Sequence, residues 1–151
     1  MPKTVPNLLK IIDFGLISSF TDENGNHLSQ QFENRFSGNQ YFASSDQMKM
    51  LTTSRKDDLV SLCYMLVYLI DRELIFLNEQ TKFIDILNKK LNLLPSELCC
   101  SEKSQPIKDF VSEIFKLGFY EKPDYAKLKF LLVKQLLEYD QTPSDDIFNF
   151  T

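Results

Sequence analysis

The longest apolar stretch of the chain lies near its middle. Between residues 59 and 70 only Ser61 is polar, so a helix formed here has no polar face. A helix without a polar face is normally buried on all sides. At ~1.5 Å per residue this stretch reaches only ~18 Å, well short of a ~30 Å bilayer core. We therefore predict that residues 54–70 form a central core helix rather than a membrane span.

The start of this helix is marked by polar residues of the expected kinds. Ser54 is a good N-cap residue, and Asp57 stands three positions later, which approximates a capping box. Asp57 and Asp58 also place two carboxylates in the first turn, where the helix dipole favours negative charge. A charged run at this point also argues against membrane insertion.

Three further helices are predicted from apolar residues that recur at helical spacing. The predicted ranges are residues 81–91, residues 107–115 with Gly118 at the C′ position, and a last helix that opens at Pro123-Asp124. The apolar faces are Phe83, Ile84, Leu87 and Leu91; Ile107, Phe110, Val111, Ile114 and Phe115; and Tyr125, Leu128, Leu132, Leu136 and Tyr139. The apolar residues near the C-terminus, 147–151, are expected to pack onto the domain.

The part before the core helix is less regular. Residues 8–12 are β-prone and end at Asp13, residues 16–18 offer a second short strand, and Asn24-Gly25 marks a turn. Residues 32–53 show neither period, which in a compact domain usually indicates a functional loop. The predicted fold is mainly α, with a short β-element at the N-terminus.

Composition narrows the classes of function. The 151 residues fit one domain, and a formal charge of −4 gives no reason to expect a nucleic acid or an anionic membrane surface as partner. No apolar segment follows Met1, so we expect no secretory signal and a cytoplasmic location, with a nuclear one also compatible. Three cysteines, Cys63 and the adjacent Cys99 and Cys100, are expected to be reduced structural thiols.

The remaining polar residues give weak signals. His27 is the sole histidine and no nucleophile with a partnering acid surrounds it, so we expect an exposed loop side chain. The Lys89-Lys90 pair is expected on a solvated face.

An ordered set of motifs carries more information than any of these residues alone. Residues 10–15 read Lys-Ile-Ile-Asp-Phe-Gly, residues 38–44 read Gly-Asn-Gln-Tyr-Phe-Ala-Ser, and residues 54–62 read Ser-Arg-Lys-Asp-Asp-Leu-Val-Ser-Leu. This order resembles the activation segment and central helix of protein kinases, specifically the casein kinase 1 family. That family has Gly-Thr-Ala-Arg-Tyr-Ala-Ser in the segment and Ser-x-Arg-Arg-Asp-Asp-Leu-Glu-Ser-Leu-Gly-Tyr at the helix start. Residues 119–125 are similar to its Phe-Glu-x-x-Pro-Asp-Tyr, and residues 146–150 resemble its closing Tyr-x-Phe-Asp-Trp. The resemblance runs from residue 8 to residue 151.

The resemblance implies roles for individual residues. Asp13 matches the acid that coordinates the Mg²⁺ bridging the nucleotide phosphates, and Phe14 and Gly15 complete that motif. Gly38, Tyr41, Ala43 and Ser44 belong to the activation segment and are expected to face the protein substrate. Asp58 matches a buried acid that braces the catalytic loop, and Arg55 would support it.

The family prefers substrates that are already phosphorylated and holds that phosphate with basic residues. Gln40 stands where the family has one of them, an arginine. Lys82 would match a second anion contact, and Arg35 would offset part of the loss.

The groups that an active kinase needs upstream of Asp-Phe-Gly have no counterpart here. The twelve residues before Asp13 contain no Asp, Glu, His or Gly, so a catalytic base and a phosphate-binding Gly-rich loop are missing from them. We therefore interpret the chain as a partial kinase domain over residues 1–151, comprising the C-terminal lobe. Mg-ATP would bind only in the complete family member, and the expected partners are a protein substrate or a complementary kinase lobe. The alternative is a degenerate pseudokinase lobe that serves as a protein-interaction scaffold.

Overall fold

The computed structural model describes residues 10–77 and 81–138, and these residues form a mainly helical domain. The principal helices are α2 (Arg55–Asp71), α3 (Phe83–Asn92), α5 (Lys108–Phe115) and α6 (Tyr125–Glu138). Shorter elements are η1 (Phe14–Leu16), α1 (Ser45–Met48), α4 (Pro95–Leu98) and η2 (Gln105–Ile107). The four predicted helices and their order are confirmed as α2, α3, α5 and α6, and every boundary that was predicted lies within about two residues of the observed one. Helices α1 and α4 were not predicted.

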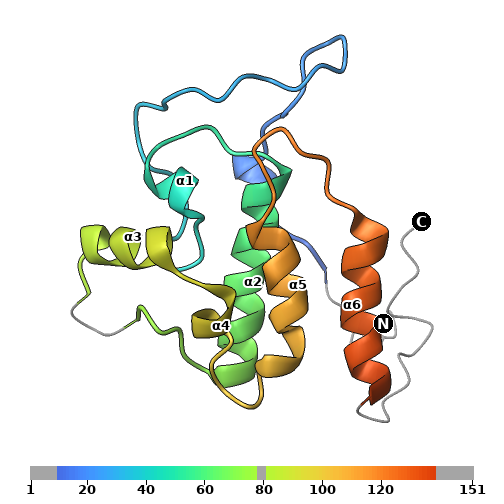
Figure 1. Cartoon of the computed structure of the whole chain (residues 1–151). Coiled ribbons are helices and arrows are strands. Elements are labelled where there is room, and N and C mark those ends of the chain that lie inside the picture. Colours follow the sequence, from blue (N-terminus) through green and yellow to red (C-terminus); the bar gives the residue numbers. More distant parts are fainter. Residues whose placement is uncertain (1–9, 78–80, 139–151) are drawn as a thin grey trace, which may run out of the picture.

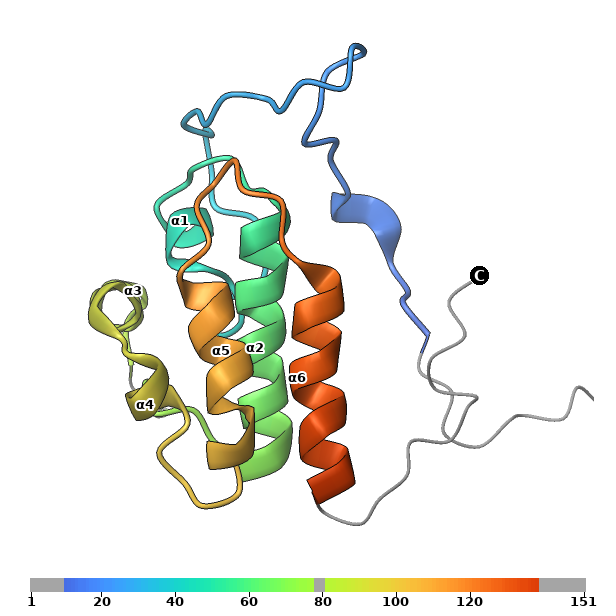
Figure 2. The ribbon, with the colours of Figure 1, turned by 45° about the vertical axis from the view of Figure 1, so that its right-hand side comes forward.

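Helices α2, α5 and α6 run side by side, and α3 and α4 lie to one side of them (Figures 1 and 2). Residues 17–35 form a long irregular segment beyond the end of the bundle where α2 begins. Within the two described ranges, no helix is long and apolar enough to cross a bilayer.

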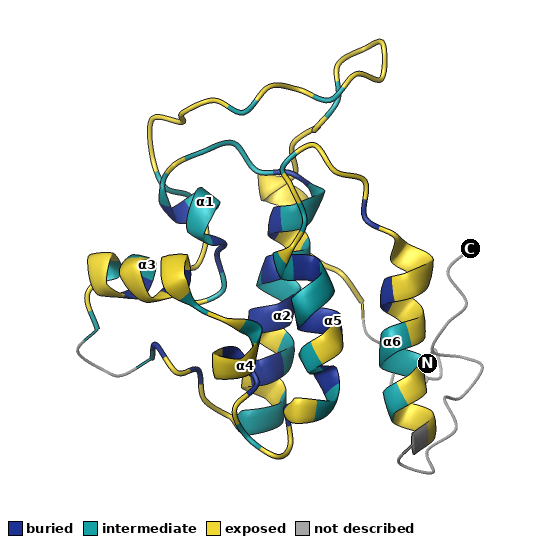
Figure 3. Cartoon of the chain, in the orientation of Figure 1, coloured by how far each residue is buried: buried dark blue, intermediate teal, exposed yellow. Residues whose placement is uncertain are grey.

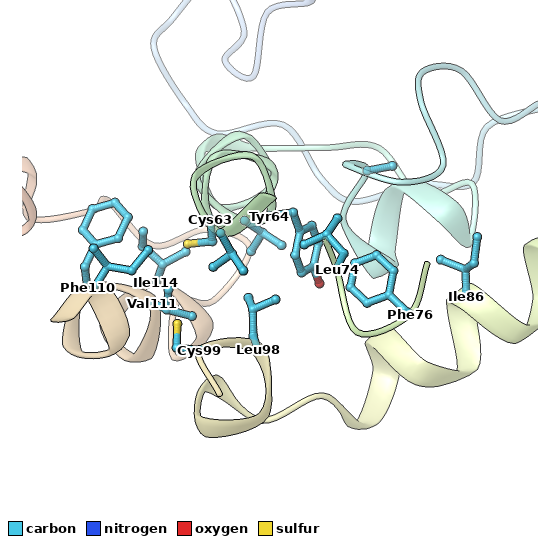
Figure 4. Packing of buried hydrophobic residues seen from close by; sticks show 14 of the residues in the cluster. Cys63, Tyr64, Leu74, Phe76, Ile86, Leu98, Cys99, Phe110, Val111 and Ile114 are labelled. Atoms are coloured by element: carbon cyan, nitrogen blue, oxygen red, sulfur yellow. The ribbon is translucent and has the colours of Figure 1, made fainter. Parts of the chain in front are cut away.

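The core lies between α2, α4 and α5 and extends toward α3 (Figure 4). Tyr64 packs edge-on against Phe76, and their ring centroids are 5.3 Å apart. Cys63 and Cys99 are fully buried free thiols, and burial raises the pKa of both; that of Cys99 rises to about 11. Thiols held protonated in this way are poor nucleophiles, which agrees with the structural role predicted for them.

Burial of α2 differs from the prediction. One face is buried through Cys63, Tyr64 and Val67, but Met65 and Leu69 on the other side are 43% and 52% exposed (Figure 3). The expectation that α2 is buried on all sides is therefore wrong for the described residues. The reason is that α5 packs against one side of α2 only, so the uniformly apolar sequence leaves part of its surface uncovered.

The predicted faces of two other helices are rotated. On α3 the buried residues are Ile86 and Lys90, whereas Ile84 and Leu91 are exposed. On α6, Leu128 is buried and Leu131 and Leu132 are partly buried, but Tyr125 and Leu136 are exposed. Tyr139 and residues 147–151 lie outside the described residues. In both helices, the predicted apolar face included an apolar residue that lies beside the buried face.

The front of the chain also departs from expectation. Residues 10–12 form no strand, and Phe14–Leu16 is a 3₁₀ helix where a second strand was predicted to begin. A strand requires a neighbour that pairs with its backbone. Within the described ranges, the β-bridges are the isolated pairs Thr21–His27 and Phe32–Leu51. The predicted turn is confirmed, since Gly25 has φ +81° and the Asp22 carboxylate accepts from the backbone N–H groups of Asn24 and Asn26.

The capping box predicted at the start of α2 is formed between Ser54 and Asp57. The Asp57 carboxylate accepts from the Ser54 N–H at 2.8 Å, and Ser54 Oγ faces the Asp57 N–H without a regular hydrogen bond. Gly118 does not occupy the C′ position, because α5 is capped by Lys116 and Gly118 follows two residues later without a positive φ. Its N–H instead donates to the Glu121 carboxylate.

Candidate functional site

The Asp-Phe-Gly motif lies at the edge of the described structure. Asp13 adopts a left-handed backbone conformation (φ 62°, ψ 75°) and caps η1, where its Oδ1 accepts from the Gly15 N–H at 3.3 Å. The Phe14 ring is 63% exposed, and Ile11 and Ile12 are still more exposed. Ile11, Ile12 and Phe14 together expose apolar side chains next to this motif.

Asp13 is the residue that the resemblance assigns to a magnesium ion. The Asp13 carboxylate is exposed, so it could reach a hydrated cation. However, residues 10–77 and 81–138 contain no cluster of three or more His, Cys, Asp or Glu side chains that could hold a metal. Mg²⁺ is commonly bound by one or two carboxylates, with water and substrate phosphates as the other ligands. Asp13 therefore fits the role of one ligand, and the set is incomplete without nucleotide and further protein groups.

In contrast, residues 38–44, which we call the 38–44 loop, form a well-ordered turn. Asn39 organises the turn, because its side-chain Oδ1 accepts from the Tyr41 N–H and its carbonyl accepts from the N–H groups of Phe42 and Ala43. Gly38 has φ +116°, a conformation that side chains rarely allow. A Cβ atom at Gly38 would lie 2.9 Å from Nε2 of Gln47, which itself donates to the Ser37 carbonyl.

The end of the 38–44 loop is tied to the start of α2. Ser44 Oγ accepts from the Gln47 N–H, which caps α1, and donates to Oδ1 of Asp57 at 2.6 Å. Both side chains are almost fully buried. A charge-assisted hydrogen bond in such a place is strong, and its loss leaves a buried group without a partner. Position 44 is thus fixed relative to the core helix.

Lys90 on α3 binds the backbone in the middle of the same loop. Its Nζ donates to the backbone carbonyl groups of Gln40, Tyr41 and Ala43 at 2.9, 2.9 and 2.7 Å. Nζ also lies 4.4 Å from the ring centroid of Tyr64 and 4.8 Å from that of Phe76, so two aromatic faces complete its surroundings. Only 5% of Lys90 is exposed, and burial lowers its pKa to about 7.

The prediction of a solvated face at Lys89-Lys90 is therefore wrong for Lys90, although Lys89 is exposed. Lys90 lies four residues after Ile86 on the same face of α3, and that spacing could have indicated an inward-pointing lysine. Its three acceptors are about fifty positions away in the sequence, and no local pattern identifies them.

Asp58, which was expected to be buried, is exposed, and the neighbouring Asp57 is the buried acid. The nearby protein displaces water from Asp58 and the Asp57 carboxylate lies next to it, and both effects raise the pKa of Asp58. Arg55 Nη2 donates to the Tyr120 carbonyl at 3.2 Å, and its guanidinium lies 4.7 Å from the Phe20 ring centroid; its supporting role in a kinase stays a prediction. It joins the start of α2 to the segment between α5 and α6.

The two residues predicted to contact an anion lie on segments that meet. Phe36 packs edge-on against Phe83, with ring centroids 5.2 Å apart, and Arg35 and Lys82 immediately precede these two rings. Both basic side chains are exposed. The structure thus places them on adjoining surface segments and leaves the anion-binding role a prediction.

His27 is half-buried rather than fully exposed, which corrects the prediction. Its ring packs against Phe20, Phe119 and Tyr120, and its Nδ1 lies 2.8 Å from the Leu28 carbonyl oxygen. The adjoining pocket of about 220 Å³ has a mixed lining of serine and threonine residues, Gln31, Glu33, Leu28 and the Phe20 and Phe119 rings. Phe119 and Tyr120, which precede α6, lie far from His27 in the sequence. Their contact with His27 was therefore not predictable from the sequence of the turn.

The sequence of the chain is similar to that of a known protein. Over 124 residues, which are 80% of the chain, it is 35% identical to Casein kinase 1-like protein HD16 of Oryza sativa subsp. japonica. The match spans 17% of the length of that relative. No protein-family model matches the chain. The sequence similarity supports a casein kinase 1-like kinase fragment, and the helical fold is consistent with the C-terminal lobe of a kinase domain.

Proposed function

We propose that this chain supplies the protein-substrate-facing part of a casein kinase 1-like serine/threonine kinase. In the complete kinase the γ-phosphate of Mg-ATP is transferred to a protein hydroxyl, largely by positioning and charge neutralisation. The observation that supports the proposal is the preformed 38–44 loop, whose sequence resembles the family's substrate-facing segment. Ser44 fixes its end to Asp57, and Lys90 fixes its backbone from α3.

The chemistry that the chain contributes is limited. Asp13 would provide one carboxylate ligand to the magnesium of a bound Mg-ATP, and the 38–44 loop would orient the acceptor peptide. The general base and the phosphate-binding groups that the family places upstream have no counterpart in the twelve residues before Asp13. We therefore expect these 151 residues by themselves not to transfer phosphate. The missing groups would come from a nucleotide-binding lobe, either on the same polypeptide or on another one.

A scaffold that binds proteins without catalysis is the second candidate. The exposed apolar residues of α2 and of the segment before η1 favour it, because a contiguous apolar surface commonly marks a protein interface. Both candidates predict binding of another polypeptide, so binding alone does not separate them. The genomic sequence upstream of Met1 offers one discriminator, since an in-frame His-Arg-Asp-x-Lys-x-x-Asn coding stretch would favour the kinase.

Phosphate transfer provides the direct test. The purified chain and its Asp13→Asn variant are each incubated with Mg-ATP and dephosphorylated casein, and incorporation of phosphate is measured. We expect background incorporation from both. Incorporation by the unmodified chain that Asp13→Asn abolishes would overturn the proposal that the chain alone is inactive.

A mixing experiment separates the kinase from the scaffold. The chain is combined with a polypeptide that carries the nucleotide-binding lobe and catalytic loop of a casein kinase 1-like protein. We expect phosphate transfer in the mixture and its loss with Asp13→Asn, since that carboxylate is needed at the metal. Stable binding without any transfer would instead support the scaffold.

A further inference from the structure

The position of Lys90 on α3 does not by itself call for a charged side chain. It is a charged side chain placed at an inward position of an amphipathic helix, where an aliphatic residue would fill the space without a desolvation cost. Its three ammonium hydrogens match three acceptors, and all of these are backbone carbonyl groups of one short loop. No carboxylate forms an ion pair with it among the described residues.

The contacts of Lys90 act on the conformation of the loop rather than on its side chains. Successive carbonyl groups of an extended or turning backbone point in different directions, so a single donor centre reaches three of them only if the chain curls around it. The curl places the carbonyls of residues 40, 41 and 43 inward. Gln40 is partly exposed, and Tyr41 is 37% exposed.

We propose that Lys90 is the positioning residue that sets the conformation of the 38–44 loop and thereby the shape of the surface offered to a protein substrate. The part concerning substrate rests on the proposed function; the part concerning loop conformation does not. The Asn39 turn alone closes the backbone between residues 39 and 43, and Lys90 attaches that closed turn to the core through α3. Tyr64 and Phe76 hold the ammonium group in place through their ring faces.

Native-state amide hydrogen exchange tests the conformational part. The amides of Phe42 and Ala43 donate to the Asn39 carbonyl at 3.1 and 2.8 Å and report opening of the loop, while those of Val111 and Ile114 in α5 report the core. The variant is Lys90→Met, and Lys89→Met is the matched control, because it removes the same charge from the adjacent, exposed position.

Three carbonyl groups lose their donor in Lys90→Met, and that of Ala43 is buried. An unsatisfied buried group costs enough to change an equilibrium by about tenfold or more. We therefore expect exchange at Phe42 and Ala43 to accelerate at least about tenfold, with α5 protection changed less than about threefold. Lys89→Met should leave both sites unchanged. Unaltered protection of Phe42 and Ala43 in Lys90→Met would overturn the proposal, as would an equal loss of protection in the loop and in α5.

A second variant keeps the test decisive if Lys90→Met does not fold. Lys90→Gln retains two N–H donors on a shorter side chain, so we expect a loss of loop protection smaller than that of a donor-free side chain and confined to the same amides. Equal acceleration throughout the domain in Lys90→Gln would show that Lys90 serves the core in general and would contradict the proposal.

Binding of dephosphorylated casein tests the functional part separately. We expect Lys90→Met to weaken casein binding about tenfold relative to Lys89→Met, in parallel with the loss of loop protection. If the unmodified chain does not bind casein, the proposed function fails, whereas the exchange result still decides the conformational role of Lys90. If casein binds equally to both variants although the loop has lost protection, the link between Lys90 and the substrate surface is wrong.

Discussion

The Ser44 hydroxyl donates a 2.6 Å hydrogen bond to Oδ1 of Asp57, and both side chains are buried. The other carboxylate oxygen, Oδ2, accepts from the Ser54 N–H at the start of α2. One carboxylate therefore joins the end of the 38–44 loop to the N-terminus of the central helix. This connection explains why the buried acid is the first of the two adjacent aspartates and not the second.

Replacement of Asp57 by asparagine should destabilise the domain. An amide can accept through its oxygen only, so its NH₂ group would face one of the two donors, the Ser44 hydroxyl or the Ser54 N–H. We expect the free energy of unfolding to fall by about 2 kcal/mol or more, measured by urea denaturation. The matched control, Asp58→Asn, removes an exposed carboxylate and should change it by no more than about 0.5 kcal/mol. Equal effects of the two substitutions would contradict the assignment of Asp57 as the structural acid.

Lys90 should make stability depend on pH near neutrality. Burial lowers its pKa from 10.5 to about 7, so between these values the unfolded chain binds more protons at this residue than the folded chain. Unfolding therefore becomes less favourable as pH rises through about 7. Tyr64 faces Lys90, and burial raises the pKa of this tyrosine; burial also raises the pKa of Cys63 and Cys99. These three groups have the opposite sign and act above about pH 8.

The comparison is therefore made between about pH 6 and pH 8. We expect the free energy of unfolding of the unmodified chain to rise more steeply with pH in this window than that of Lys90→Met. Parallel slopes would show that the three carbonyl groups keep the ammonium charged and that the pKa of Lys90 is not lowered.

The helices were predictable from the sequence because their signals are local. The uniformly apolar run of α2 and the stripe of α5 each lie within a single element, and the boundaries follow from flanking polar residues. The Ser44–Asp57 and Lys90 contacts were not predictable, because they join residues 13 to 50 positions apart. For Asp58, the family resemblance suggested burial, but the elements that pack against α2 in the described structure leave this position exposed.

Replacement of Gly38 by alanine should destabilise the domain more than the same replacement of Gly25. At Gly38→Ala the new Cβ would combine an unfavourable φ of +116° with a 2.9 Å contact to Gln47 Nε2, whose hydrogen bond to Ser37 would be broken. Gly25→Ala is the control, because φ is +81° there but nothing lies within 4 Å of the added atom. We expect the first variant to lose about 1 kcal/mol more stability than the second, measured by thermal unfolding. A larger loss at Gly25 would refute the steric argument.

The exposed side of α2 should bind hydrophobic dyes and promote self-association. Met65 and Leu69 lie on this side, whereas Val67 is 1% exposed on the buried one. We expect the double variant Met65→Lys, Leu69→Lys to bind less of a hydrophobic fluorescent dye and to scatter less light, with stability changed by no more than about 1 kcal/mol. Val67→Lys should abolish cooperative unfolding, because it buries a charge. Loss of folding in the double variant would mean that this side is covered.

The most direct test of the account is to map where a protein substrate touches the chain. A peptide from dephosphorylated casein is titrated into the isotopically labelled chain, and amide shifts are followed by NMR. The account predicts the largest shifts in the 38–44 loop, with weaker ones at Arg35 and Lys82. Saturable shifts that avoid the loop and cluster on α6 or on the exposed side of α2 would contradict it, as would an absence of binding at millimolar peptide.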